Sequence, residues 1–255
     1  MTAEHLLDLD GPANFRDVGG HPTLDGHFVR RGQVFRSDSL SGLSERDVEH
    51  LRQAVGIRTV IDLRAGHEVE EYGHGPLQSH VRQLHMPIVD STREPEPTTR
   101  KERKARTFQT LAEIYLFMLE EYGSRFAMVL RVIADADAQP VVFHCAAGKD
   151  RTGLTAALTL GVCGVADDLI AADFAFTEKR MPTIIARHTE RASGPDASIE
   201  VAGQQYGAQA LTMIAVLDAL RSEHGSIENY VASVGLEAEV IAALRASLVT
   251  DGPDG

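Results

Sequence analysis

The sequence predicts an α/β fold, because strand-like and helix-like segments alternate through its first 150 residues. Two segments carry most of this prediction. Residues 58–64 have the apolar, β-branched centre of a buried strand. Residues 140–143 form a short apolar run that leads into a glycine-containing turn, and an alanine-rich helix begins near residue 152.

The first third of the chain contains further elements of both kinds. Ser44 is followed three residues later by Asp47 in the pattern of a capping box, which predicts a helix that runs to about Ala54. The remaining predicted elements are a strand at 34–37, a short helix at 68–72 and a strand at 81–88.

Beyond residue 110 the sequence is mainly helical. Apolar residues recur every three or four positions in 111–119 and 126–133, which predicts two amphipathic helices. After residue 152 the predicted helices are 152–163, 167–180, 182–191, 208–223, 227–234 and 237–248. Gly164, Gly225 and Gly235 stand where helices should end. We interpret 192–206 as a loop and 251–255 as a flexible tail.

Composition and charge narrow the class of protein. With 43% hydrophobic and 24% charged residues, the chain of 255 residues fits one ordinary globular domain. The net charge of -12 argues against nucleic-acid partners, because lysine and arginine must neutralise the phosphates of a polyanion. Residues 1–9 lack the form of a secretory signal, and no stretch approaches the ~20 apolar residues of a membrane helix. We therefore expect a cytoplasmic protein without integral membrane association.

Six arginine and lysine residues gather in the segment 91–106, among prolines and glutamates. Charge runs usually face water, so we interpret the segment as a solvated linker or an exposed helix start. A basic flap that attracts phosphorylated substrates is the alternative.

The two cysteines differ in their surroundings. They are too few for a disulfide framework or a tetrahedral zinc site. Cys163 lies in the apolar run 158–165, which is typical of a small buried hydrophobe. Cys145 instead follows the strand at 140–143 and opens the turn before the helix. The backbone amides of such a turn form an anion-binding nest at the helix N-terminus.

The residue types in 144–153, His-Cys-Ala-Ala-Gly-Lys-Asp-Arg-Thr-Gly, predict a nucleophilic phosphate site. The amides, the helix dipole and the cations Lys149 and Arg151 should stabilise a Cys145 thiolate, which can attack a bound phosphorus atom. Five residues separate Cys145 from Arg151, so the loop can curl around a phosphate while the guanidinium grips two oxygens. The predicted phosphate-binding residues are Ala146, Ala147, Gly148, Lys149 and Thr152.

Two neighbours of the nucleophile have supporting roles in this prediction. We expect His144 to hydrogen-bond the backbone beside Cys145 and hold the loop, because a stabilised thiolate needs no general base. The Thr152 hydroxyl can donate to the cysteine sulfur or to the second-step intermediate.

The segment 144–153 resembles the signature loop of protein tyrosine and dual-specificity phosphatases. Its ending, Gly-Lys-Asp-Arg-Thr-Gly, is similar to the bacterial branch to which the mycobacterial tyrosine phosphatases belong. Further segments resemble that branch in matching order, namely 14–20, 35–39, 61–64, 172–174 and 225–230. The resemblance covers about 10–248.

This resemblance implies one phosphatase domain over 1–255, with its core in 10–248 and a central, mostly parallel sheet flanked by helices. The helix-rich C-terminal half would cover the site as a lid. The implied reaction is hydrolysis of phosphotyrosine through a phosphocysteine, with no metal and no other cofactor. Phosphoserine, phosphothreonine and phosphoinositides are further substrates that the resemblance implies.

The general acid has three candidates, because residues 100–120 contain no aspartate and the chain has no Trp-Pro-Asp triplet. They are Asp150, Asp62 and Asp90. Asp150 is favoured because it serves in the resembling branch, whereas Asp62 is expected to pair with an arginine such as Arg64 and to order neighbouring loops.

The role of Lys149 has two interpretations. Lys149 suits a ligand with more than one phosphate, such as a phosphoinositide, or it only raises the positive potential around Cys145. Arg16 and Asp17 are expected to brace the site.

Three other functions are compatible with parts of the sequence. A nucleotide-binding P-loop is excluded, because Phe143 and Asp150 stand where glycine and serine or threonine are required. The eleven histidines form no His-Glu-x-x-His pair, so a metal enzyme is not favoured. A non-catalytic phosphate-binding module would not need the thiolate of Cys145.

Overall fold

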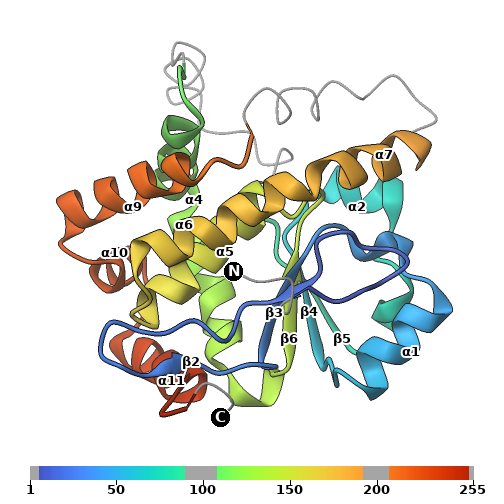
Figure 1. Cartoon of the computed structure of the whole chain (residues 1–255), viewed down its shortest axis with the longest axis horizontal. Coiled ribbons are helices and arrows are strands. Elements are labelled where there is room, and N and C mark those ends of the chain that lie inside the picture. The colour runs from blue at the N-terminus through green and yellow to red at the C-terminus, as the bar shows by residue number, and fades with distance from the viewer. Residues whose placement is uncertain (1–5, 90–107, 192–206, 253–255) are drawn as a thin grey trace.

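A five-stranded sheet runs through the centre of the structure, a computed structural model that describes residues 6–89, 108–191 and 207–252 (Figure 1). Its strands, in spatial order, are β1 (Arg16–Asp17), β3 (Val34–Ser37), β6 (Val141–His144), β4 (Thr59–Asp62) and β5 (Arg82–His85). The strands β3, β6, β4 and β5 are parallel, and β1 pairs antiparallel with β3. The predicted central, mostly parallel sheet is confirmed.

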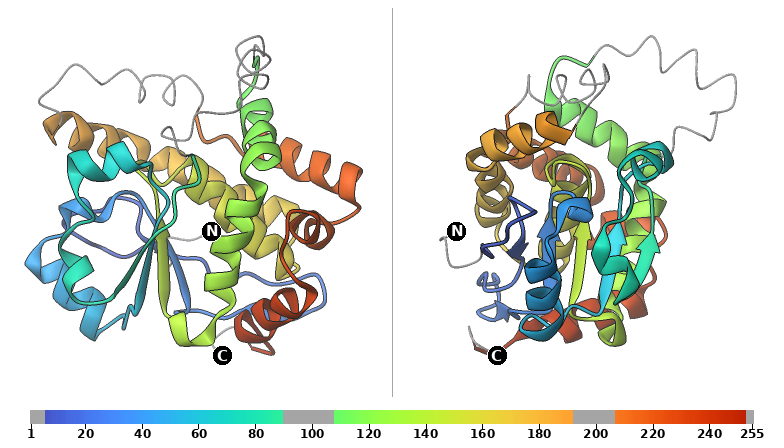
Figure 2. Two further views of the ribbon diagram at one scale, coloured as in Figure 1. Left: turned by 180° about the vertical axis from the view of Figure 1, so that it is seen from behind. Right: turned by 90° about the vertical axis from the view of Figure 1, so that its right-hand side faces the viewer.

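Alternate side chains of β6 face opposite sides of the sheet, as the pleat of a strand requires. Val141 and Phe143 belong to the larger apolar cluster, whereas Val142 belongs to the smaller one. The larger cluster lies under α4 (Leu111–Ala134) and α5 (Asp150–Val162), and the smaller one under α1 (Glu45–Gln53). Figures 1 and 2 show α1 and α4 on opposite sides of the sheet.

The remaining helices are α2 (Gly66–Tyr72), α6 (Asp167–Phe176), α7 (Met181–Arg191), α9 (Ala210–His224), α10 (Ile227–Ser233) and α11 (Ala238–Leu248). The predicted helices therefore exist, with bounds that differ by a few residues. The capping box of α1 forms as predicted, since the Ser44 side chain accepts from the Asp47 amide and the Asp47 carboxylate accepts from the Ser44 amide. Gly164, Gly225 and Gly235 have positive φ angles of 83°, 82° and 102°, as helix-ending glycines do.

Two features of the fold differ from the prediction. The helices predicted at 111–119 and 126–133 are one helix, α4, with a single non-helical residue at Tyr122 (φ -119°, ψ 16°). Three strands of two residues each were not predicted, because so short a run carries no periodic signal. They are β1 and the antiparallel pair β2 (Phe28–Val29) and β7 (Val249–Thr250).

The basic segment 91–106 and the predicted loop 192–206 lie outside the described residues. Within the described ranges, no helix combines the length and the apolarity that a membrane crossing requires.

Candidate active site

The carboxyl ends of three adjacent parallel strands bring the predicted site together. In the register of the sheet, His144 of β6 lies between Ser37 of β3 and Asp62 of β4. The loop that follows His144 starts at Cys145, and α5 begins at Asp150. In Figure 1 these strand ends lie at the edge of the molecule where α2 and α7 are found. Ligands of open α/β sheets bind at this edge.

The backbone of the loop is anchored to the segment that follows β3. The Ser39 amide donates to the Ala146 carbonyl at 2.9 Å. Gly148 has a φ of +65°, and a Cβ atom there would lie 2.6 Å from both the Ser37 carbonyl oxygen and the Asp38 amide nitrogen. Only glycine fits at this position, because a side chain would be strained and would also clash with backbone.

A buried cluster of Arg16, Arg36 and Asp173 is connected to the same loop through Gly148. Arg36 donates to the Gly148 carbonyl at 2.9 Å and forms an ion pair with Asp173 of α6. Arg16 donates to the other Asp173 oxygen at 3.0 Å. Burial alone would raise the pKa of Asp173, but the two arginines hold it well below its usual range. Arg16 thus reaches the loop through Asp173 and Arg36, whereas the Asp17 carboxylate accepts from the amides of Gly19 and Gly32 in a neighbouring turn.

His144 and Cys145 are both buried, and the cysteine is 2% exposed. Nδ1 of His144 lies 3.2 Å from the Cys145 carbonyl oxygen, which makes Nδ1 the protonated nitrogen because a carbonyl only accepts. Burial lowers the pKa of His144 to about 4, despite the opposing attraction of Asp62. The ring is thus neutral at neutral pH, and the predicted hydrogen bond to the backbone beside Cys145 is present.

Asp62 is fully buried at the end of β4 and is committed to Arg64. The arginine Nε donates to Oδ1 at 2.9 Å, and its Nη2 donates to Oδ2 at 2.7 Å. Burial by itself would raise the pKa of Asp62, but His144, Arg64 and His74 together hold it well below its usual range. An ionised carboxylate in a bidentate pair is a poor proton donor, which argues against Asp62 as general acid. Asp90, another of the three candidates, lies outside the described residues.

Arg151 is held by a carboxylate that the sequence did not identify. Glu68 of α2 accepts from both terminal nitrogens of the guanidinium, at 2.5 Å and 2.9 Å. Burial alone would lower the pKa of Arg151, but this pairing with Glu68 raises it above its ordinary value. The sequence indicates the role of Glu68 only through its position, in a short helix that follows the strand ending at Asp62. The pair fixes the plane of the guanidinium.

Replacement of Glu68 by glutamine should weaken this fixation while the guanidinium keeps its charge. We expect Glu68→Gln to lower kcat/KM for an aryl phosphate by about 10-fold, the effect of weakening one charged hydrogen-bond pair. Steady-state kinetics would check this. An unchanged kcat/KM would show that the fixation is dispensable, and an increased one would show that Glu68 competes with phosphate for Arg151.

Asp150 stands at the first turn of α5 with its side chain 34% exposed. The ammonium group of Lys149, which is almost completely buried, lies 3.6 Å from its Oδ1 atom. The hydroxyl group of Tyr115, on α4, donates to the same oxygen at 2.5 Å. In the sequence, Tyr115 is one position on the apolar face of a helix, and nothing there indicates this contact. The Thr152 hydroxyl is buried and has no hydrogen-bond partner in the described part of the chain.

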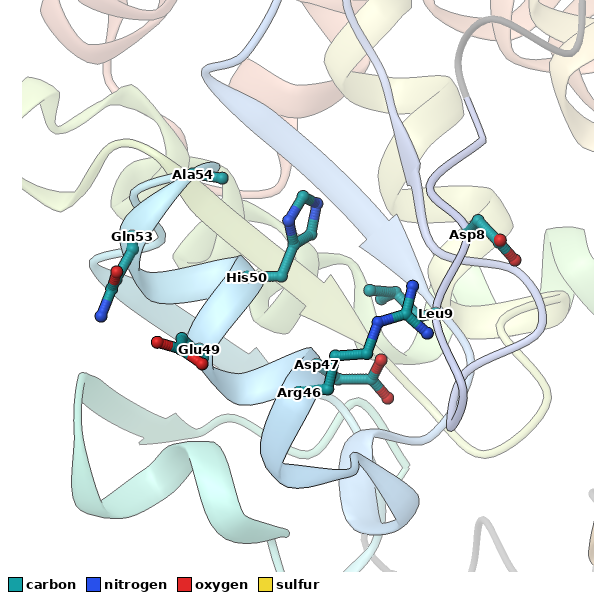
Figure 3. Close-up of a pocket in the computed structure, with 8 residues that line it drawn as sticks. All are labelled: Asp8, Leu9, Arg46, Asp47, Glu49, His50, Gln53 and Ala54. Atoms are coloured by element: carbon teal, nitrogen blue, oxygen red, sulfur yellow. The ribbon is translucent and has the colours of Figure 1, made fainter.

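Cys163 and a cavity beside α1 lie away from the loop. Cys163 is completely buried, which confirms its interpretation as a buried hydrophobe, and burial raises the pKa of its thiol to about 12. A cavity of about 340 Å³ is lined by residues of α1 together with Asp8, Leu9 and Ala54, and Figure 3 shows none of the loop residues among them. Neither Cys163 nor this cavity belongs to the candidate site around Cys145.

A cysteine at the end of a buried strand, with an arginine six positions on in the first turn of the next helix, is the arrangement of cysteine-dependent phosphatases. Residues 7–250 match the tyrosine phosphatase family, and the chain belongs to that family. It is a protein-tyrosine phosphatase and hence a phosphoric monoester hydrolase.

Relatives span nearly the whole chain. A candidate tyrosine-protein phosphatase of Cupriavidus necator is 30% identical, over 96% of this chain and 89% of its own length. The triple specificity protein phosphatase PtpB of Mycobacterium tuberculosis is 27% identical, over 96% of this chain and 99% of its own. Among solved structures, the Siw14 catalytic core is 11% identical with a TM-score of 0.38, over 78% of this chain and 95% of that one.

Proposed function

We propose that Cys145 is the nucleophile, Arg151 the phosphate clamp and Asp150 the general acid of this tyrosine phosphatase. The observation that carries the proposal is that one anchored loop supplies all three groups. Its backbone is fixed at Ala146 and Gly148, and its guanidinium is fixed by Glu68. Preorganised groups of this kind stabilise a transition state without reorganising during the reaction.

The proposed reaction has two steps. In the first, the Cys145 sulfur forms a bond to phosphorus while the bond to the leaving oxygen breaks, and that oxygen takes the proton of Asp150. In the second, water attacks the phosphocysteine and gives a proton to Asp150, and the sulfur leaves as a thiolate. Inorganic phosphate is released. The Thr152 hydroxyl, which has no hydrogen-bond partner among the described residues, is available to donate to the departing sulfur.

During both steps the phosphoryl oxygens need donors. We assign these contacts to the backbone of the loop, to the Arg151 guanidinium and to the positive potential of Lys149. The proposed phosphate-binding residues are Ala146, Ala147, Gly148, Lys149 and Thr152. We assign supporting roles to His144, which bonds the backbone at Cys145, and to Asp62 and Arg64, which pair with each other at the end of β4 beside His144.

Phosphotyrosine is the proposed principal substrate, with phosphoserine and phosphothreonine as further ones. Two relatives are named as protein phosphatases, and one of them is named triple specificity. Phosphoinositides are the alternative, for which a second cation in the loop would be useful. The Lys149 ammonium is buried beside Asp150, so its charge acts within the loop itself and favours the protein substrate.

The experiment that tests the nucleophile is trapping of the intermediate. Acid quenching of the wild-type enzyme during turnover of an aryl phosphate should yield a phosphorylated peptide that contains Cys145, detected by mass spectrometry. A panel of phosphotyrosine, phosphoserine and phosphothreonine peptides and phosphoinositides, ranked by kcat/KM, tests the substrate class. Phosphorylation at another residue, or none under single-turnover conditions, would overturn the assignment.

Asp150→Asn tests the general acid. An aryl oxygen leaves acceptably as an anion, but an alkyl oxygen needs a proton, so the variant should lose on the order of 100-fold in kcat on alkyl phosphates. The loss on an activated aryl phosphate such as p-nitrophenyl phosphate should be much smaller. Rates across a series of leaving groups would measure the difference, and equal slowing of all substrates would refute the role of Asp150.

Dilute hydrogen peroxide should inactivate the enzyme reversibly. A reactive thiolate is oxidised first to sulfenic acid, which thiol reductants return to the thiol. We expect activity to fall with peroxide, to recover with dithiothreitol and to be protected by bound inorganic phosphate. Insensitivity to peroxide would count against a thiolate at Cys145. The need to keep such a thiol reduced also supports a cytoplasmic location, which cell fractionation can test.

A further inference from the structure

The buried hydroxyl group of Tyr115 contacts Asp150, the proposed general acid. Tyr115 lies in the second turn of α4 and is completely buried. Its hydroxyl donates to Oδ1 of Asp150 at 2.5 Å. Burial, followed by the charge and the hydrogen bond of Asp150, raises the pKa of Tyr115 well above its ordinary value. The phenol is therefore a hydrogen-bond donor to Asp150 throughout the working pH range.

The ring of Tyr115 has little freedom to move. It packs edge-on against Phe174 of α6, with ring centroids 5.9 Å apart and an interplanar angle of 89°. Phe174 in turn fills the space beside Gly153, where a Cβ atom would come within 2.9 Å of its ring. Gly153 lies in the first turn of α5, three residues after Asp150. The donor and the acceptor are thus positioned by the same packed group of helices.

We propose that Tyr115 is a positioning residue for Asp150, which fixes the acid so that a single oxygen handles the proton. This inference rests on the proposed role of Asp150. Tyr115 donates to Oδ1, and the Lys149 ammonium lies 3.6 Å from the same atom. Among the described residues, none donates a hydrogen bond to Oδ2. The proton that passes to the leaving oxygen, and returns from water in the second step, is carried by Oδ2.

Tyr115→Phe removes the hydroxyl and keeps the ring that packs on Phe174. A hydrogen bond to a charged group is worth about 10-fold or more in rate, so we expect kcat on alkyl phosphates to fall about 10- to 30-fold. On p-nitrophenyl phosphate the loss should stay below about 3-fold, because little protonation is needed there. The dependence of log kcat on leaving-group pKa should steepen, and KM should change little.

A double-mutant cycle separates positioning from general structural damage. The variant with both Tyr115→Phe and Asp150→Asn should be no slower than Asp150→Asn alone, because the hydroxyl acts only through that carboxylate. The matched control is Tyr230→Phe, which removes another buried tyrosine hydroxyl, one that donates to the Leu119 carbonyl of α4 at 2.9 Å. Its leaving-group dependence should equal that of the wild type.

Two results would overturn the proposal and distinguish its failure from that of the wider mechanism. Equal slowing of aryl and alkyl substrates by Tyr115→Phe, additive with Asp150→Asn, would make Tyr115 a purely structural residue. If Asp150→Asn itself showed no dependence on leaving group, the general acid would be wrong, and Tyr115 would lose its role with it. Trapping of phosphorylated Cys145 in Tyr115→Phe would confirm in either case that the nucleophile is intact.

Discussion

Cys145→Ser should abolish turnover and leave phosphate binding in place. A serine hydroxyl is not ionised under conditions where a thiolate forms, so loss of the nucleophile should lower kcat on the order of 10⁴-fold or more. The backbone of the loop and Arg151 remain, because serine is nearly isosteric and Glu68 still holds the guanidinium. Steady-state kinetics and calorimetric titration with inorganic phosphate would measure the two properties separately.

The chain supplies a matched control for this variant in its other cysteine. Cys163 is completely buried in an apolar environment, remote from the reaction. Cys163→Ala should lower the thermal midpoint of unfolding through the small cavity that it creates, while kcat stays near that of the wild type. Substantial hydrolysis by Cys145→Ser, or loss of turnover in Cys163→Ala with the fold intact, would contradict the assignment of the nucleophile.

Arg151→Lys should be the second most damaging change. Lysine keeps the positive charge but has no planar fork to grip two phosphoryl oxygens, and it cannot satisfy both oxygens of Glu68 as the guanidinium does. We expect kcat/KM to fall on the order of 10²- to 10³-fold, comparable with removing one preorganised donor from a transition state. Kinetics on an aryl phosphate, together with thermal unfolding to verify the fold, would measure this.

Arg221→Lys is the corresponding control. Arg221 of α9 makes the same kind of bidentate pair, with Asp167 of α6, at 2.8 Å and 2.7 Å. This pair joins two helices, and neither of its residues belongs to the loop around Cys145. Its replacement should leave kcat/KM unchanged within about 2-fold, since a partly exposed ion pair contributes little to stability. Near-normal activity of Arg151→Lys would show that the fork geometry is dispensable and would weaken the clamp assignment.

The candidate catalytic residues of the loop could be predicted from the sequence, because they lie within one short continuous segment, 144–153. Cys145, Asp150 and Arg151 follow a recognisable strand, and the glycine at 148 marks the required turn. The sheet could be predicted for a similar reason, since buried strands such as Thr59–Asp62 have a continuous apolar centre. The predicted helix bounds lie within a few residues of the observed ones where a capping residue or a terminal glycine marks the end of the helix.

The residues that support the loop could not be predicted, because their partners are distant in the sequence. Glu68 reaches Arg151 across 83 positions, and Tyr115 reaches Asp150 across 35. Each looks ordinary in its own segment, one as an acidic residue of a short helix and the other as part of an apolar stripe. A tyrosine on a buried face does carry a weak signal, since its hydroxyl must find a partner. Which partner it finds is decided by packing.

The support of Gly148 by Arg36 and Asp173 limits how the catalytic segment can be reused. The carbonyl that Arg36 holds belongs to the loop, but the arginine comes from β3 and its carboxylate partner from α6. Grafting only residues 144–153 onto a foreign scaffold would transfer the nucleophile and the guanidinium without the scaffold that shapes them. A transplantable unit would have to include at least the adjacent strands β3 and β6 together with α5 and α6, so the smallest engineerable catalytic module is far larger than the ten-residue segment.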